Sequence, residues 1–210
     1  MMSKLKHFII GVLLISTLSC SQDKKTILLG TYPFIVSMDE DFTDFTFVKI
    51  ESKSLLKLIG DNAYSFELKK DIKSLISNAD KLILSIGLFD LLKGIYYENS
   101  LIRYQYLPSV LELFELNLYH IISSLYEYNK HLNITLLSLF NPYLFEDNSF
   151  YYDIDLSVDY YNLVIKNISE EFNAKYLDIK CLSSYLITFN TCSQEGKEII
   201  MGLINNEWTK

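Results

Sequence analysis

Histidine, glycine and proline are scarce in this sequence of 210 residues, which contains 3, 7 and 3 of them respectively. A phosphate-binding loop needs closely spaced glycines, and no such cluster occurs. A metal centre needs His, Cys, Asp or Glu ligands at short, regular spacings, and no group of these residues has them. Neither a nucleotide-binding nor a metal-dependent protein is supported, and we expect no cofactor.

Positive charge is scarce as well. Lysine and arginine total 19 against 26 acidic residues, which gives a formal net charge of -7, and Arg103 is the only arginine. An acidic surface of this kind repels nucleic acid, because the phosphate backbone is itself negatively charged. We therefore do not expect a nucleic-acid partner.

The first twenty residues have the order of a bacterial export signal. Lys4 and Lys6 precede an apolar run from Phe8 to Leu18, which is too short to span a bilayer, and Cys20 follows the run closely. The end of this segment resembles a lipobox, whose cysteine becomes the lipidated first residue of the mature protein, with Thr17 in place of the usual large aliphatic residue. Ordinary secretory cleavage and retention as a transmembrane anchor are the alternatives.

This interpretation divides the chain into a signal peptide at residues 1–19, a lipid-anchored tether at 20–25 and a domain at 26–210. Removal of residues 1–19 takes two lysines away, so the formal charge falls from -7 to -9. We expect an extracytoplasmic protein, attached through Cys20 to a bacterial membrane on its periplasmic side or at the cell surface. There Cys181 and Cys192 could form a disulfide, or both could be small buried residues.

Apolar runs and helix-period stretches alternate along the rest of the chain. The apolar runs predict strands at Thr26–Gly30, Phe45–Ile50, Lys81–Gly87, Ile134–Phe140 and Lys175–Ile179. The helix-period stretches lie near Ser65–Ser77, Ile102–Tyr128, Val158–Phe172 and Gln194–Asn206, and Pro108 marks the start of the longest helix or a kink in it. Strands that alternate with helices pair in parallel. The sequence therefore predicts a three-layer α/β sandwich around a five-stranded parallel sheet.

The stretch from Lys81 to Ile95 is the most informative. A buried strand is stopped by Gly87, and Asp90 follows three residues later. In open α/β sheets, ligands bind at the carboxyl ends of the strands, so Asp90 could face a ligand-binding crevice. The alternative is a structural role for Asp90 as the cap of the next helix.

Three segments of the chain resemble the SGNH (GDSL) hydrolases, small three-layer α/β esterases and lipases. Residues 79–92 are similar to the family's third block, a strand running into Gly-x-Asn-Asp, and Gly87 and Asp90 match its first and last positions. Ser138–Tyr143 resembles the fourth strand and its Asn-Pro turn, and Asp178 stands where the fifth strand often carries an aspartate. The resemblance implies a flavodoxin-like strand order and, in a typical member, ester hydrolysis by serine, histidine and aspartate.

The residues that carry this chemistry in the family are replaced. Tyr32 stands at the nucleophilic serine of the first block, and Asn62 at the oxyanion glycine of the second, where it could equally be an ordinary turn residue. Phe89 stands at the asparagine donor of the third block. Thr188 and Thr191 stand at the aspartate and histidine of the last block. The resemblance therefore leaves no catalytic residue in place.

The remaining histidines and serines do not restore the missing residues. His120 lies within the predicted long helix, and His131 precedes the fourth strand, at the opposite edge of the sheet from the crevice. Ser37 and Ser193 lie near the first and last blocks, but neither supplies a base. In a well-studied serine hydrolase, loss of the nucleophile or base costs about a millionfold in rate. We expect an SGNH-like fold without SGNH hydrolysis.

These replacements favour a binding role. Tyr32 and Phe89 enlarge the aromatic surface of the crevice, which suits a ligand, although they could also simply fill an abandoned cavity. We expect a membrane-anchored, catalytically inactive lipoprotein that binds a protein, a glycan or a small molecule. The alternative is an esterase with a rebuilt active site.

A tether of six steps reaches at most about 20 Å, so the domain should sit close to the membrane. Because the first strand follows directly from this tether, the amino edge of the sheet should face the membrane.

Overall fold

Five parallel strands form the centre of the protein. The computed structural model describes residues 26–30, 45–49, 70–88, 90–91, 107–141, 150–188 and 191–208. The strands are β1 (Thr26–Gly30), β2 (Phe45–Lys49), β3 (Lys81–Ser85), β4 (Asn133–Leu137) and β5 (Lys175–Leu177). They lie side by side in the order β2-β1-β3-β4-β5, and every neighbouring pair is parallel. The predicted sheet and its flavodoxin-like order are confirmed.

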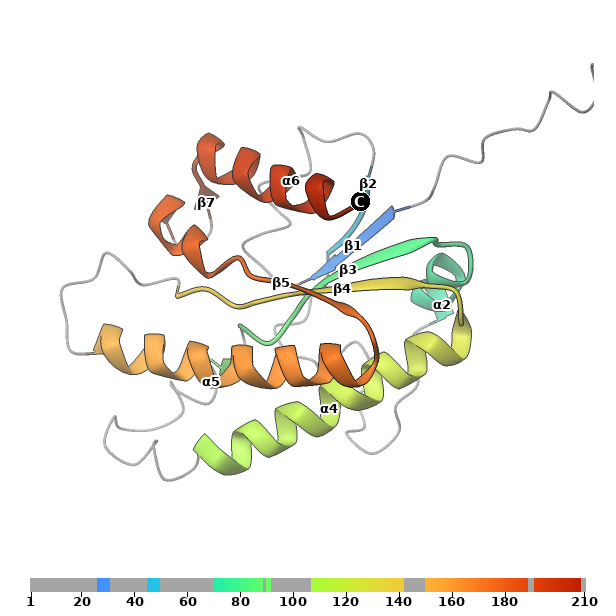
Figure 1. The fold of residues 1–210 in the computed structure, drawn as a ribbon, viewed down its shortest axis with the longest axis horizontal. Helices are drawn as coiled ribbons and strands as arrows, with labels where there is room; N and C mark the ends of the chain where they lie inside the picture. Colours follow the sequence, from blue (N-terminus) through green and yellow to red (C-terminus); the bar gives the residue numbers. More distant parts are fainter. Residues whose placement is uncertain are drawn as a thin grey trace, which may run out of the picture.

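Helices cover both faces of this sheet. On one side lie α2 (Lys70–Ser77), α4 (Leu107–Tyr128) and α5 (Phe150–Glu171), and on the other lies α6 (Gln194–Trp208), as Figure 1 shows. Alternate residues of a strand therefore enter two different cores. Leu82 and Leu84 of β3 pack in the core beneath α4 and α5, whereas Ile83 packs with residues of α6. Burial on both faces explains why β1 and β3 are continuous apolar runs in the sequence.

The strands end before the apolar runs that predicted them. β3 ends at Ser85 and β4 at Leu137, yet Ile86, Leu139 and Phe140 are still buried. The apolar residues that follow the last hydrogen bond of each strand are buried at the point where the chain turns away from the sheet. An apolar run therefore locates a strand but does not fix its carboxyl end.

Two helix predictions can be compared directly with the structure. α4 begins at Leu107, so Pro108 lies in the first turn, where its missing N–H costs no hydrogen bond, and it marks the start of the helix. α5 begins at Phe150, so the predicted start at Val158 is wrong. Ile154 lies one turn before Val158 on the same buried face, but the aspartates around it obscure the apolar period in the sequence.

The sequence did not predict the segment between β5 and α6. A 3-10 helix, η3 (Lys180–Tyr185), is followed by an antiparallel hairpin of β6 (Leu186–Thr188) and β7 (Thr191–Cys192). These elements are too short for a periodic pattern. Cys181 in η3 is exposed and is a free thiol. Within the described ranges, none of the helices has both the length and the apolar character needed to cross a membrane.

Candidate functional site

The carboxyl edge of the sheet brings polar residues from three strands together. Ser85 ends β3 and lies in register with Gly30, the last residue of β1. Ser138 follows β4 and Asp178 follows β5, and these strands pair through Leu137 and Leu177. In an open α/β sheet this edge is where ligands bind. It is therefore the candidate functional site.

Gly87 shapes the turn after β3. Its φ of +107° is one that side-chain-bearing residues rarely adopt, and a Cβ added there would lie 2.8 Å from Cε2 of Phe114. The Gly87 carbonyl accepts a hydrogen bond from the Leu91 N–H at 2.9 Å, so a helical turn begins directly after the glycine. Asp90 lies inside this turn. The interpretation of Asp90 as the helix cap is therefore wrong, because Gly87 occupies the cap position.

Tyr161 of α5 carries the one buried side-chain oxygen without a hydrogen-bond partner among the described residues. The side chain is 1% exposed, and its ring lies 4.7 Å from the ring of Phe114, centroid to centroid. Burial raises the pKa of Tyr161 far above its ordinary value, and the negative charge of Asp90 raises it further. The hydroxyl therefore stays protonated beneath the turn that follows β3.

Replacing Tyr161 by phenylalanine tests whether this hydroxyl is unbonded. We expect Tyr161→Phe to raise the free energy of unfolding by about 1 kcal/mol, because it removes a buried polar group that gains no hydrogen bond. Urea unfolding measures the change. Tyr160→Phe is the matched control, since Tyr160 is 45% exposed and should respond little. A loss of stability on Tyr161→Phe would show that the hydroxyl is bonded in solution.

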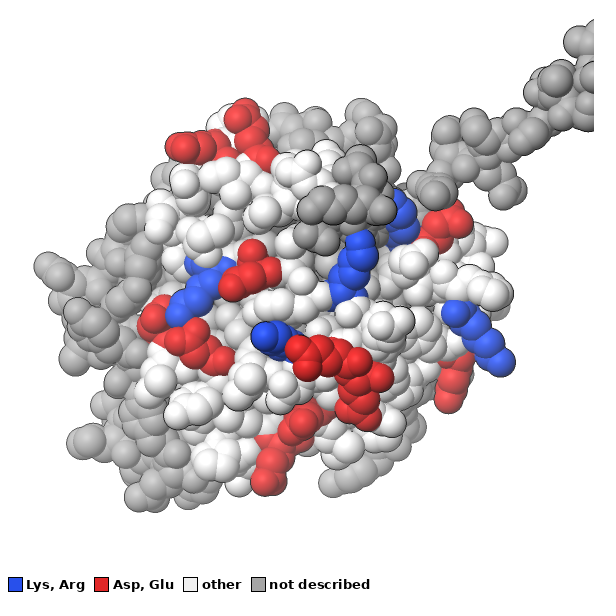
Figure 2. All heavy atoms as spheres, viewed as in Figure 1, with Lys and Arg blue, Asp and Glu red and all other residues white. Residues whose placement is uncertain are grey.

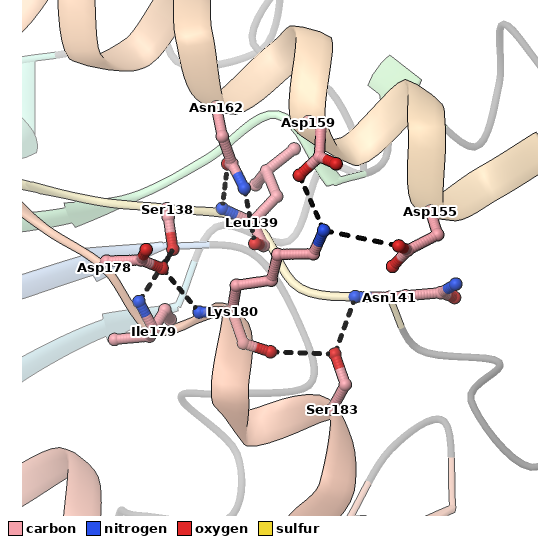
Figure 3. Close-up of polar contacts among 10 residues, drawn as sticks. All are labelled: Ser138, Leu139, Asn141, Asp155, Asp159, Asn162, Asp178, Ile179, Lys180 and Ser183. Atoms are coloured by element: carbon pink, nitrogen blue, oxygen red, sulfur yellow. Dashed lines mark hydrogen bonds and ion pairs between the residues drawn. The ribbon is translucent and has the colours of Figure 1, made fainter.

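Asn162 fixes the loop that follows β4. Its Oδ1 accepts a hydrogen bond from the Leu139 N–H at 2.6 Å, and its Nδ2 donates to the Leu139 carbonyl at 2.9 Å (Figure 3). Both residues are buried. The Asn162 side chain thus replaces a missing strand neighbour for both backbone groups of one residue. The sequence carried a signal for this, since Asn162 is a polar residue on the buried face of α5.

Ser138 and Asp178 join the loops that follow β4 and β5. The Ser138 hydroxyl donates to Asp178 Oδ1 at 3.0 Å and accepts from the Ile179 N–H at 2.7 Å, and the Lys180 N–H donates to the same carboxylate oxygen at 2.8 Å. Ser138 is 1% exposed. A serine this deeply buried is out of reach of a substrate, so its hydrogen bond to Asp178 is a structural link between the two loops.

Lys180 ties η3 to α5 at the rim of the site. Its Nζ lies 2.6 Å from Asp159 Oδ1 and 3.3 Å from Asp155 Oδ2 (Figure 3). Burial alone would lower the pKa of Lys180, but the hydrogen bonds to Asp159 and Asp155 outweigh it and raise that pKa. Lys180 therefore remains a cation that offsets one of two carboxylates. This lysine is a further site residue that the sequence reasoning missed.

The hairpin before α6 contains the two predicted positions of the last block. Thr188 and Thr191 pair with each other across β6 and β7, so the structure brings them together. Ser193 follows, and its Oγ accepts a hydrogen bond from the Gly196 N–H at 3.1 Å, which makes Ser193 the amino-terminal cap of α6. The serine near the last block thus has a structural role.

Both histidines of the predicted domain lie away from this edge. His131 is exposed in the turn between α4 and β4, at the amino edge of the sheet. His120 lies on α4 with its ring edge-on to Tyr119. Across the described part of the chain, no group of three or more His, Cys, Asp or Glu side chains is placed to hold a metal ion.

Several other predicted positions fall outside the described residues. These are Tyr32, Asn62 and Phe89, which were predicted for the crevice, Ser37 near the first block, and Cys20, the predicted lipid-attachment residue. Of the residues predicted for the third block, Gly87 and Asp90 are described, and both lie at the carboxyl edge.

Solved structures resemble this arrangement over nearly its whole length. A lipase from a goat rumen metagenome has a TM-score of 0.64 at 14% identity, covering 87% of this chain and 96% of the lipase. A GDSL-like lipase from Bacteroides thetaiotaomicron has a TM-score of 0.61 at 13% identity, with 91% and 92% covered. The chain has an SGNH hydrolase-like fold. No protein-family model and no curated protein matches the sequence.

One further similar structure bears on the chemistry of the fold. An acetylxylan esterase from Geobacillus stearothermophilus has a TM-score of 0.58 at 14% identity, covering 87% of this chain and 93% of the esterase. A catalytic mutant of that esterase has a histidine replaced by alanine. At identities this low, the similarity shows the fold of this chain and leaves its activity open.

Proposed function

We propose that this protein is a membrane-anchored lipoprotein whose SGNH hydrolase-like domain binds a ligand or partner and does not hydrolyse esters. One observation carries the proposal. Thr188 and Thr191 occupy the hairpin that leads into α6, where the resemblance expects aspartate and histidine. The chain contains no histidine after His131, which lies at the opposite edge of the sheet. No histidine is therefore available at the carboxyl edge to act as a general base.

The polar groups described at this edge support the same proposal. Ser138, Asp178 and Asn162 all bond to neighbouring loops, and Lys180 is paired with two carboxylates. Such bonds hold the loops of the edge in fixed positions, which favours binding by a preformed surface. Acyl transfer would instead need a serine that a substrate can reach, next to a base and beside an oxyanion hole.

Ester turnover tests this proposal. We expect the purified full chain to hydrolyse short acyl nitrophenyl esters no faster than a buffer blank with matched detergent. In a serine hydrolase, loss of the nucleophile or of the base lowers the rate about a millionfold. The turnover of an inactive domain therefore differs from that of an active esterase by far more than the assay error. The Geobacillus acetylxylan esterase serves as the positive control. Turnover well above the blank would favour the alternative, an esterase with a rebuilt active site.

The anchor is a separate part of the proposal. Lipid on Cys20 would place a tether of six residues before β1, with a reach of at most about 20 Å. Because β1 enters from its amino end, the amino edge of the sheet would face the membrane and the carboxyl edge would face away. Cys20→Ala is expected to abolish incorporation of labelled palmitate and to release the protein from membranes. Persistence of both in the variant would contradict lipidation.

A further inference from the structure

The described part of the protein exposes large apolar side chains on two helices only. All seven of its exposed large hydrophobic residues lie on α4 and α5. Six of them are between 39% and 55% exposed and lie in the first two thirds of their helices: Leu113, Leu116, Tyr119, Leu156, Tyr160 and Leu163. We call these six residues the outer patch. The seventh residue, Tyr128, lies beneath Lys73 of α2, whose Nζ is 4.8 Å from the centroid of the Tyr128 ring.

The two halves of the outer patch lie next to each other. α4 and α5 run in the same direction, because each leads from the carboxyl edge of the sheet into the next parallel strand. Figure 1 shows the two helices side by side beneath the sheet. Phe114 contacts Tyr161 between the two helices, at 4.7 Å between ring centroids. The outer patch is therefore shared between two neighbouring helices of one layer.

The surroundings of the outer patch are acidic. α4 carries Glu112, Glu115 and Glu127 and contains no lysine or arginine. α5 carries five acidic residues and one lysine, and two of its aspartates are paired with Lys180. Figure 2 shows acidic side chains predominating over the lower part of the molecule, where these helices lie. A partner that covers the leucines must therefore come close to uncompensated negative charge.

We propose that the outer patch docks a basic amphipathic helix from a partner protein. Leucines and tyrosines spaced along two parallel helices form ridges against which a third helix can pack its apolar stripe. Lysine or arginine beside that stripe would meet the glutamates of α4, which gives charge complementarity. This surface lies on the helical layer, so it is independent of the carboxyl edge and goes beyond the function proposed above.

A second copy of the chain fits this surface less well. Two copies related by symmetry would bring the same glutamates together across the contact, which costs free energy. This repulsion favours a single basic helix over a homodimer.

Titration with a defined peptide tests the proposal. The full chain is held in a nanodisc of zwitterionic phosphatidylcholine, and empty nanodiscs give the background. The probe is a fluorescent amphipathic peptide of leucine and lysine, about 18 residues long, and its fluorescence anisotropy reports binding. We expect micromolar binding that weakens as salt rises, and about tenfold weaker binding of a peptide with glutamate in place of lysine.

Variants locate the binding. The double substitution Leu116→Gln and Leu163→Gln is expected to weaken the basic peptide about tenfold, whereas Tyr128→Gln, outside the patch, should leave its affinity within about twofold. Circular dichroism checks that the variants fold, and exposed substitutions rarely disturb folding. Absence of binding, equal binding of the acidic peptide, or an unchanged affinity in the double variant would overturn the proposal. Self-association that the double variant loses would assign the patch to a second copy instead.

Discussion

Asn162→Ala is expected to lower the free energy of unfolding by about 3 kcal/mol. The asparagine bonds both backbone groups of Leu139, at 2.6 Å and 2.9 Å, in a place where both residues are buried. Alanine cannot replace either bond, and an unsatisfied buried polar group costs about 1–3 kcal/mol. Urea or thermal unfolding followed by circular dichroism measures the effect, which should appear as a shift of the midpoint.

Asn167→Ala is the matched control for this prediction. Asn167 lies on the same helix, five residues further on, and is exposed. The same substitution there should change the free energy of unfolding by less than about 0.5 kcal/mol. If the two variants were equally stable, the bonds from Asn162 to Leu139 would contribute nothing, and the loop after β4 would have to be held by other contacts.

Gly87→Ala is expected to cost a similar amount, about 3 kcal/mol. Two effects add, because a side chain at φ +107° strains the backbone and its Cβ would lie 2.8 Å from the ring of Phe114. Phe114 is 2% exposed and packs against Tyr161, so its ring has little room to move. The same unfolding measurement reports the loss.

Gly202→Ala provides the opposite result as a control. A Cβ at Gly202, within α6, would meet no atom within 4 Å. Alanine is the better helix former, so this substitution should be neutral or raise the free energy of unfolding by up to about 1 kcal/mol. Loss of stability in both variants would show that the cost at Gly87 does not come from its backbone angle and the Phe114 contact.

The sheet could be predicted because its central strands are short apolar runs buried on both sides. Ile27, Leu28 and Leu29 of β1 are each 1% exposed, so no polar residue interrupts the pattern. Strands that alternate with helices pair in parallel. The resemblance to the SGNH hydrolases then implied the order of the strands. The start of α5 was missed because its first turns, around Ile154, are rich in aspartate.

The polar contacts of the candidate site could not be predicted in the same way. The bond between Ser138 and Asp178 joins residues 40 positions apart, and the one between Asn162 and Leu139 joins residues 23 apart. A sequence pattern reports local periodicity, whereas these contacts depend on how separate loops meet at the end of the sheet. The pairing of Lys180 with Asp155 and Asp159 depends in addition on η3, which leaves no periodic signal.

The proposed function separates the fold of this protein from the ester hydrolysis that is typical of the fold. The turn after β3, with Gly87 against Phe114, and the loops held by Asn162 and Ser138 maintain the carboxyl edge of an SGNH-like sheet. The proposed function takes Thr188 and Thr191, in the hairpin before α6, to stand where the sequence resemblance expects an aspartate and a histidine. Under that proposal, the edge keeps its structural residues and lacks the catalytic ones.

Labelling of the full chain with a fluorophosphonate probe tests the absence of a catalytic serine most directly. The probe forms a covalent bond with a serine only where a neighbouring base activates the hydroxyl. The Geobacillus acetylxylan esterase, treated in parallel, confirms that the probe is active. We predict that intact-mass spectrometry will find no labelled serine in this protein. Stoichiometric labelling of one serine, with ester turnover lost when that serine is replaced by alanine, would contradict the account.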